Sequence, residues 1–253
     1  MRRRRKAPGD AAIQGPPGAD RMRVAPGLPR RKRLAMTAST CDDGASMTSG
    51  YSSLWDWRRQ VADLYAAIRA NPNPQAAWQH WRAVRDALFR GHPQTPIEPG
   101  AAFTALPVLP YDPALRFVVP LAPLDGPDEI FPTGADGDLR MRPFARTAGL
   151  APALGGELTA YWLLGYGGGV FLPFADATSG RETYGAGRYL LDTIKGADLG
   201  GAPDGRAVLD FNFAYNPSCA YSPRYVCPLA PRANRLPAPV RAGELAPGQE
   251  TAR

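Results

Sequence analysis

From residue 92 onward, the chain consists of short apolar runs separated by glycine and proline. The 253 residues include 27 Gly and 28 Pro, which interrupt long helices and favour turns. Leu115, Phe117, Val119 and Leu121 stand at alternate positions, as in a half-buried strand. Further strands are expected over residues 139–145, 158–164, 170–174, 182–184, 188–194 and 207–215. Short strands at this spacing predict a mainly β (α+β) fold, built as an antiparallel β-sandwich or a small β-barrel.

Two helices are predicted before this β region. Apolar residues from Leu54 to Ile68 recur at helical spacing, and Ser52 or Ser53 is expected to cap this first helix. Asn73 and Pro74 begin the second helix, which ends at Gly91. The two helices form a hairpin packed on the sheet, and the apolar surface between them is expected to hold the tryptophans: Trp55, Trp57, Trp78 and Trp81.

The positive charge of the chain lies almost entirely in its first 35 residues. This segment holds eleven Lys or Arg and two Asp, whereas the other 218 residues hold 19 basic and 21 acidic side chains. We therefore expect a disordered basic leader over 1–50, one globular domain over 52–245 and a disordered tail over 246–253. The leader is either an arm that binds nucleic acid or anionic membrane, or translated upstream sequence with synthesis starting at Met36 or Met47. The nearly neutral domain is not expected to bind nucleic acid.

Several function classes find no support in the sequence. There is no apolar run of export-signal length or of the roughly 18 residues that cross a membrane, which predicts a cytoplasmic protein without a membrane partner. Cys219 and Cys227 are then expected as reduced thiols, and their C-x7-C spacing is not that of a zinc site, so no metal is expected. The glycines at 165–169 lead into a strand rather than a helix, which excludes a phosphate loop, and no cofactor is expected. The oligomeric state stays open.

Three long motifs lie in the second half of the chain. They read ETYGAGRY at 182–189, DFNFAYNPSCAYSPRYVCP at 210–228 and NRLPAPVRAGE at 234–244. Together with Trp57, Arg58, His92 and Pro93, they resemble an uncharacterised bacterial family known as domain of unknown function 1684. The resemblance extends over about residues 52–245. It implies no activity, because none is established for that family.

Polar residues of these motifs are candidates for a ligand site. In a strand over 208–215, Asp210 and Asn212 point to the face opposite Leu209, Phe211 and Phe213. If neighbouring strands pair, Asp210 and Asn212 line one polar concavity together with other polar residues. The full set of candidate ligand-binding residues is Glu182, Tyr184, Arg188, Asp210, Asn212, Tyr215, Asn216 and His92. One interpretation is a pocket for a small polar ligand, with hydrolytic or acid–base chemistry as an extension. The other is a non-catalytic structural or partner-binding module, in which the same residues form a buried hydrogen-bonded scaffold.

Overall fold

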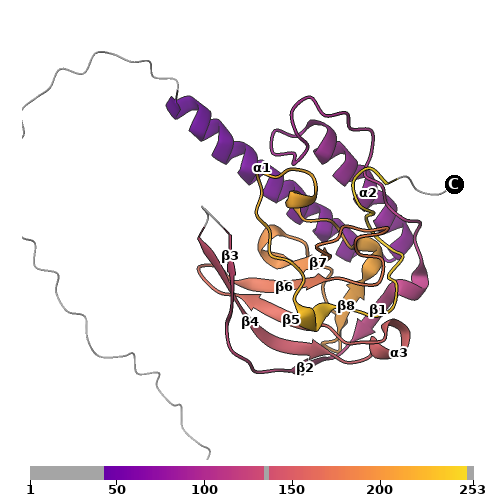
Figure 1. The fold of residues 1–253 in the computed structure, drawn as a ribbon. Coiled ribbons are helices and arrows are strands. Elements are labelled where there is room, and N and C mark those ends of the chain that lie inside the picture. The colour runs from indigo at the N-terminus through magenta and orange to yellow at the C-terminus, as the bar shows by residue number, and fades with distance from the viewer. Residues whose placement is uncertain (1–42, 134–136, 250–253) are drawn as a thin grey trace, which may run out of the picture. The chain divides into compact units, whose positions relative to one another are not determined.

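The computed structural model describes residues 43–133 and 137–249 (Figure 1). In this part of the chain, α1 (Asp43–Ala70) and α2 (Pro74–Gly91) precede the strands, and α3 (Ala151–Leu154) is a single turn between two of them. Figure 1 shows α1 and α2 next to each other, on one side of the sheet. The predicted mainly β fold with an N-terminal helical hairpin is confirmed.

Eight antiparallel strands form two sheets in the described residues. The smaller sheet pairs β1 (Arg116–Val119) with β8 (Ala207–Asp210). The larger sheet has the order β2-β4-β5-β6-β7, with β3 also paired to β4. Its strands are β2 (Leu121–Pro123), β3 (Glu129–Pro132), β4 (Asp138–Thr147), β5 (Thr159–Leu163), β6 (Gly169–Phe174) and β7 (Arg188–Asp192). The described strands leave both sheets open, so of the two predicted architectures the small closed barrel is not the one observed.

The first helix begins nine residues before the predicted cap. Ser52 and Ser53 lie inside α1, and the Ser53 hydroxyl donates to the carbonyl of Gly50 at 2.9 Å. A serine hydroxyl that bonds back to the preceding turn does not mark a helix start, so the predicted cap is wrong. The sequence before Ser52 contains no proline that would end the helix there.

The second helix starts at the predicted position. The Asn73 side chain accepts a hydrogen bond from the Ala76 amide at 3.1 Å, and Pro74 occupies the first helical position. Trp78 and Trp81 are buried on this helix, and the Trp81 ring meets Phe213 edge-on at 5.6 Å. Trp57 is half-buried. Trp55 is 69% exposed and does not join the core, contrary to the prediction.

The larger sheet buries side chains on both faces. On one face, Leu172, Phe174 and Leu190 belong to the main core, which also contains Trp81. On the other face, a smaller cluster gathers around Phe171 and Tyr189, whose rings meet at 4.7 Å. Because both faces are covered, all residues of β7 are buried, including the charged Arg188 and Asp192.

Four predicted strands differ from the structure. The strand expected from Leu115 to Leu121 is divided at Pro120 into β1 and β2, which belong to different sheets. The strand expected over 188–194 ends at Asp192, where a 3-10 helix begins.

Residues 182–184 lie in turns beside the isolated Ser179–Thr183 bridge, not in a strand. The strand predicted over 207–215 ends at Asp210, and Phe211–Phe213 form a 3-10 helix. The Asp210 carboxylate accepts from the Asn212 amide at 3.1 Å, and this local cap replaces the next ladder bond. Asp210 and Asn212 therefore do not stand two places apart on a strand.

Parts of the predicted domain plan lie outside the described residues. These parts are the leader up to residue 42 and the end of the tail, 250–253. In the described chain, no helix is both long and apolar enough to cross a membrane.

Candidate functional site

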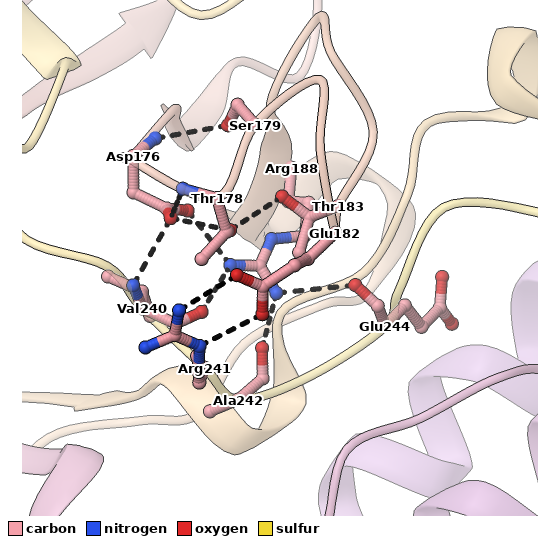
Figure 2. Close-up of polar contacts among 10 residues, drawn as sticks. All are labelled: Asp176, Thr178, Ser179, Glu182, Thr183, Arg188, Val240, Arg241, Ala242 and Glu244. Atoms are coloured by element: carbon pink, nitrogen blue, oxygen red, sulfur yellow. Dashed lines mark hydrogen bonds and ion pairs between the residues drawn. The ribbon is translucent and has the colours of Figure 1, made fainter. Parts of the chain in front are cut away.

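Arg188, the first residue of β7, is one of the most buried side chains of the protein (Figure 2). Its Nη2 atom donates to Asp176 at 3.0 Å and to the Val240 carbonyl at 2.9 Å. Its Nη1 atom donates to the carbonyls of Ala242 and Glu244. Burial lowers the pKa of Arg188, and Asp176 opposes this shift. The guanidinium group is thus fully engaged in holding the segment 240–244 against the sheet.

Glu182 lies on the outer side of the same segment. Its two carboxylate oxygens each accept from Arg241 at 2.9 Å, in an exposed bidentate pair (Figure 2). Tyr184 is half-buried and turns elsewhere, with its hydroxyl 3.7 Å from Cys219 Sγ. Glu182 and Arg188 therefore both contact the segment 240–244, whereas Tyr184 lies against Cys219.

Asp210 and Asn212 do meet, on the other side of the fold. Asn212 Nδ2 donates to Asp210 Oδ1 and to the Asp112 carbonyl, both at 2.8 Å. Asp210 also lines a cavity of about 370 Å³ that includes the arginines Arg69 and Arg116. Neither residue contacts Glu182, Tyr184 or Arg188, so the five polar residues do not line one concavity.

His92 ends α2, and both of its ring nitrogens have partners. Nδ1 accepts from the Gln94 amide at 3.0 Å, and Nε2 lies 3.3 Å from Asp56. The ring also packs edge-on against Trp57 at 5.1 Å. His92 therefore joins α1 to the end of α2, apart from the other candidate residues.

Tyr215 and Asn216, the last two candidates, line a second cavity of about 100 Å³. We call it the Tyr65–Asn216 cavity. It lies between the helical hairpin, the end of β7 and the loop that follows Phe213. The helices contribute Trp57, Tyr65, Arg85 and Phe89 to its walls. β7 and the residues just after it contribute Tyr189, Asp192 and Lys195. The loop contributes Tyr215, Asn216, Ser218 and Cys227.

A buried ion pair supports one wall of this cavity. Arg85 on α2 donates from Nε and Nη2 to Glu244 Oε1, at 2.8 and 2.6 Å. The other oxygen of Glu244 accepts from the Asn216 amide at 2.7 Å and from the Tyr221 hydroxyl at 3.0 Å. Figure 2 shows this side chain pointing away from Arg188, which holds the Glu244 backbone. Burial lowers the pKa of Arg85, but Glu244, Tyr221 and Tyr65 together outweigh this effect, so the pKa of Arg85 is raised and its guanidinium group stays charged.

Two residues that line the cavity each carry a fully buried polar atom with no hydrogen-bond partner among the described residues. These atoms are the hydroxyl of Tyr65 and Oδ1 of Asn216. Burial raises the pKa of Tyr65 to about 12, so its hydroxyl stays protonated near neutral pH and remains a donor. The indole N–H of Trp81 faces the Tyr65 oxygen and lowers the pKa of Tyr65 slightly, but an indole cannot accept the tyrosine proton, so that proton has no acceptor in the part of the chain that the structure describes. A buried polar group without a partner lowers the stability of the folded protein by about 1–3 kcal/mol. Tyr65 is thus an unsatisfied donor, and Asn216 Oδ1 is an unsatisfied acceptor.

Sequence reasoning missed three residues of this site: Tyr65, Arg85 and Glu244. Arg85 stands on the buried stripe of α2, four residues after Trp81, where a charge among apolar residues is unusual. Glu244 ends the motif at 234–244. The sequence thus shows an unusual buried position for Arg85 and a motif position for Glu244. It does not show that the two residues, 159 positions apart, form a pair in the folded protein.

No metal site is formed by His, Cys, Asp or Glu side chains in residues 43–133 and 137–249. The cavity walls offer hydroxyl, amide and guanidinium groups, together with the Asp192 carboxylate, the Lys195 ammonium group and the Cys227 thiol.

Comparison with known proteins places the chain in a family. A family model described as "Protein of unknown function (DUF1684)" matches residues 101–245. The solution NMR structure of an uncharacterized protein from Haloarcula marismortui is 30% identical, and the match covers 68% of this chain and 93% of that chain with a TM-score of 0.48. A search of curated proteins gives no match. Since the family model covers more than half of the sequence, the chain belongs to the DUF1684 family of proteins of unknown function.

Proposed function

We propose that this protein binds a small uncharged molecule in the Tyr65–Asn216 cavity. The observation that carries the proposal is the pair of buried, unpartnered atoms, the Tyr65 hydroxyl and Asn216 Oδ1. They belong to two residues, 151 positions apart in the sequence, that both line this cavity. Tyr215 and Asn216 are the two sequence candidates that the proposal retains as ligand contacts.

The chemistry of the walls narrows the ligand class. Tyr65 requires an acceptor and Asn216 Oδ1 requires a donor, so the ligand carries both, as hydroxyl and primary amide groups do. Arg85 is neutralised by Glu244, and Lys195 lies 3.2 Å from Asp192 at the cavity edge. With the charges already paired, an ionised ligand would bury an uncompensated charge at high cost. The ligand is therefore a neutral amide or polyol.

The size of the cavity limits how much of the ligand it holds. Its volume of about 100 Å³ is below the roughly 300–1,000 Å³ of pockets that enclose drug-sized molecules. It takes a molecule of a few non-hydrogen atoms, or one end of a larger one. Aromatic rings at Trp57, Tyr189 and Tyr215 provide flat apolar surface beside the polar groups.

A fragment screen against the full chain tests this function. Small neutral amides and polyols are compared with carboxylates of the same size, by thermal shift and by calorimetric titration. We expect binding from the neutral set and not from the carboxylates. If no neutral amide or polyol binds, the proposal is wrong.

Tyr65→Phe is the decisive variant, because it removes only the unpaired hydroxyl. We expect the affinity for the fragment to fall about 3- to 10-fold, the loss of one hydrogen bond. The free energy of unfolding of the free protein should stay unchanged or rise by up to about 1 kcal/mol, since the lost group had no partner. Tyr111→Phe is the matched control, because its hydroxyl lies near Asp210 and outside the cavity. Equal binding by Tyr65→Phe and the wild type would contradict the proposal.

A further inference from the structure

Two cysteines of the second motif lie against each other beside the cavity. The Cys219 amide donates to Cys227 Sγ at 3.4 Å, and both thiols are free and only partly buried. Their loop contains Pro223, which restricts the backbone between them. Neither thiol takes part in the Arg85–Glu244 ion pair or in the Arg188 contacts.

The surroundings make the two thiols unequal. A hydrogen bond from Cys227 lowers the pKa of Cys219 to about 6, and the same contact raises the pKa of Cys227. The hydroxyl of Tyr184, 3.7 Å from Cys219 Sγ, adds a second donor to the thiolate. Within the pair, the negative charge of a thiolate is therefore favoured on Cys219 over Cys227. The thiolate is the form of cysteine that reacts with oxidants.

We propose that Cys219 and Cys227 are a redox-active pair that hydroperoxides oxidise to a disulfide, with Cys219 as the attacking thiol and Cys227 as the resolving one. This inference does not depend on the proposed ligand. Tyr184 acts as a positioning residue, because its hydroxyl lies within reach of both the carbonyl oxygen of Cys219, at 3.5 Å, and its sulfur, at 3.7 Å.

The chemistry takes two balanced steps. The Cys219 thiolate attacks one peroxide oxygen, the O–O bond breaks, and the departing oxygen takes up a proton to leave as water or an alcohol. The Cys219 sulfur has then lost two electrons to the peroxide and is a sulfenic acid. The Cys227 sulfur next attacks the Cys219 sulfur, and the S–O bond breaks. The hydroxide leaves as water with the Cys227 proton, and the disulfide forms. A dithiol reductant returns both cysteines to the starting state by exchange.

The experiment uses the full chain with Cys41→Ser, so that only these two cysteines remain. The protein is treated with hydrogen peroxide, free thiols are blocked with a maleimide, and the intact mass and peptide map are measured. We expect a mass lower by two hydrogens and a single peptide link between Cys219 and Cys227. Two alkylated thiols after peroxide, or a link between two molecules, would overturn the proposal.

Three further variants separate the roles. With Cys227→Ser, dimedone should trap a sulfenic acid on Cys219. With Cys219→Ser, peroxide should leave the Cys227 thiol open to alkylation, because the attacking thiol is absent. Tyr184→Phe should move the pH profile of Cys219 alkylation upward, whereas Tyr225→Phe in the same loop should not. Dimedone labelling of Cys227 in place of Cys219, or unchanged profiles in Tyr184→Phe, would contradict the assigned roles.

Discussion

Buried carboxylates in this protein differ in how well they are paired. Asp176 lies 3.0 Å from Arg188, and Glu244 lies 2.6 Å from Arg85. Asp210 is equally buried, but the nearest guanidinium atom, Arg116 Nε, is 3.6 Å away. Burial raises the pKa of Asp210, and the hydrogen bonds from Asn212 only partly oppose this effect. Of these three buried carboxylates, Asp210 is therefore the one whose negative charge is least stabilised by a neighbouring guanidinium group.

This imbalance predicts a pH dependence that Asp210→Asn removes. A carboxyl group with a raised folded-state pKa binds its proton more tightly in the folded than in the unfolded chain. Its contribution to stability is therefore full below the unfolded value near 3.8 and is lost as the pH rises through the folded value. The measurement is the free energy of unfolding of both proteins, from denaturation at several pH values that start below 3.8 and extend above the folded-state pKa of Asp210. As the pH rises, the free energy of unfolding of the wild type should fall relative to that of Asp210→Asn. A difference that stays constant, or grows in favour of the wild type, would show that Asp210 is well compensated.

At the scale of single elements, the sequence predicted those helix starts and strand positions that depend on residues close together in the chain. Asn73 with Pro74 located the start of α2, and short apolar runs between turn residues located the strands from β4 to β7. The failures have one cause, which is competition from local hydrogen bonds. The alternation after Leu209 continues through Phe211 and Phe213, but the Asp210 side chain caps a 3-10 turn there. Alternation alone does not reveal such a cap.

The candidate site was only partly predictable for a different reason, which is long-range contact. The polar motif residues were recognised, and Tyr215 and Asn216 line a cavity. Arg188 was expected either to face a ligand or to join a buried scaffold, and it is surrounded by backbone carbonyls from a segment 52 to 56 residues later. Contacts at this separation are set by how the chain folds back and leave no periodic pattern in the sequence.

The cap of α2 gives a prediction at this scale. Asn73→Ala removes the acceptor for the Ala76 amide, which should lower the free energy of unfolding by about 0.5–2 kcal/mol. Gln75→Ala, at an exposed position two residues later, is the control and should change it by less than about 0.5 kcal/mol. Urea denaturation measures both. A cap variant as stable as the control would mean that α2 is held by its buried face alone.

At the scale of the whole molecule, the segment 240–244 connects distant parts of the fold. Arg188 binds its backbone from the sheet, and Asp176 accepts from the Val240 amide at 3.1 Å. From the end of the same segment, Glu244 reaches α2 through Arg85. One extended stretch thereby ties the helical hairpin, the sheet and the cavity loop together.

The strength of this connection is measurable with two arginine variants. Arg188→Met leaves Asp176 as an unpaired buried charge, and we expect a loss of about 3–5 kcal/mol in the free energy of unfolding. Arg241→Ala breaks an exposed pair with Glu182 and should leave that free energy nearly unchanged. Guanidinium denaturation of both proteins gives the comparison. A small loss in Arg188→Met would instead support a functional role for this side chain, as the sequence first indicated.

The Arg85–Glu244 pair also sets an order of events during protein synthesis. Arg85 leaves the ribosome 159 residues before its counter-ion. Until then, docking α2 would bury a guanidinium group with nothing to neutralise it, which is costly. The hairpin must therefore wait, undocked and open to chaperones, until almost the whole domain has been translated.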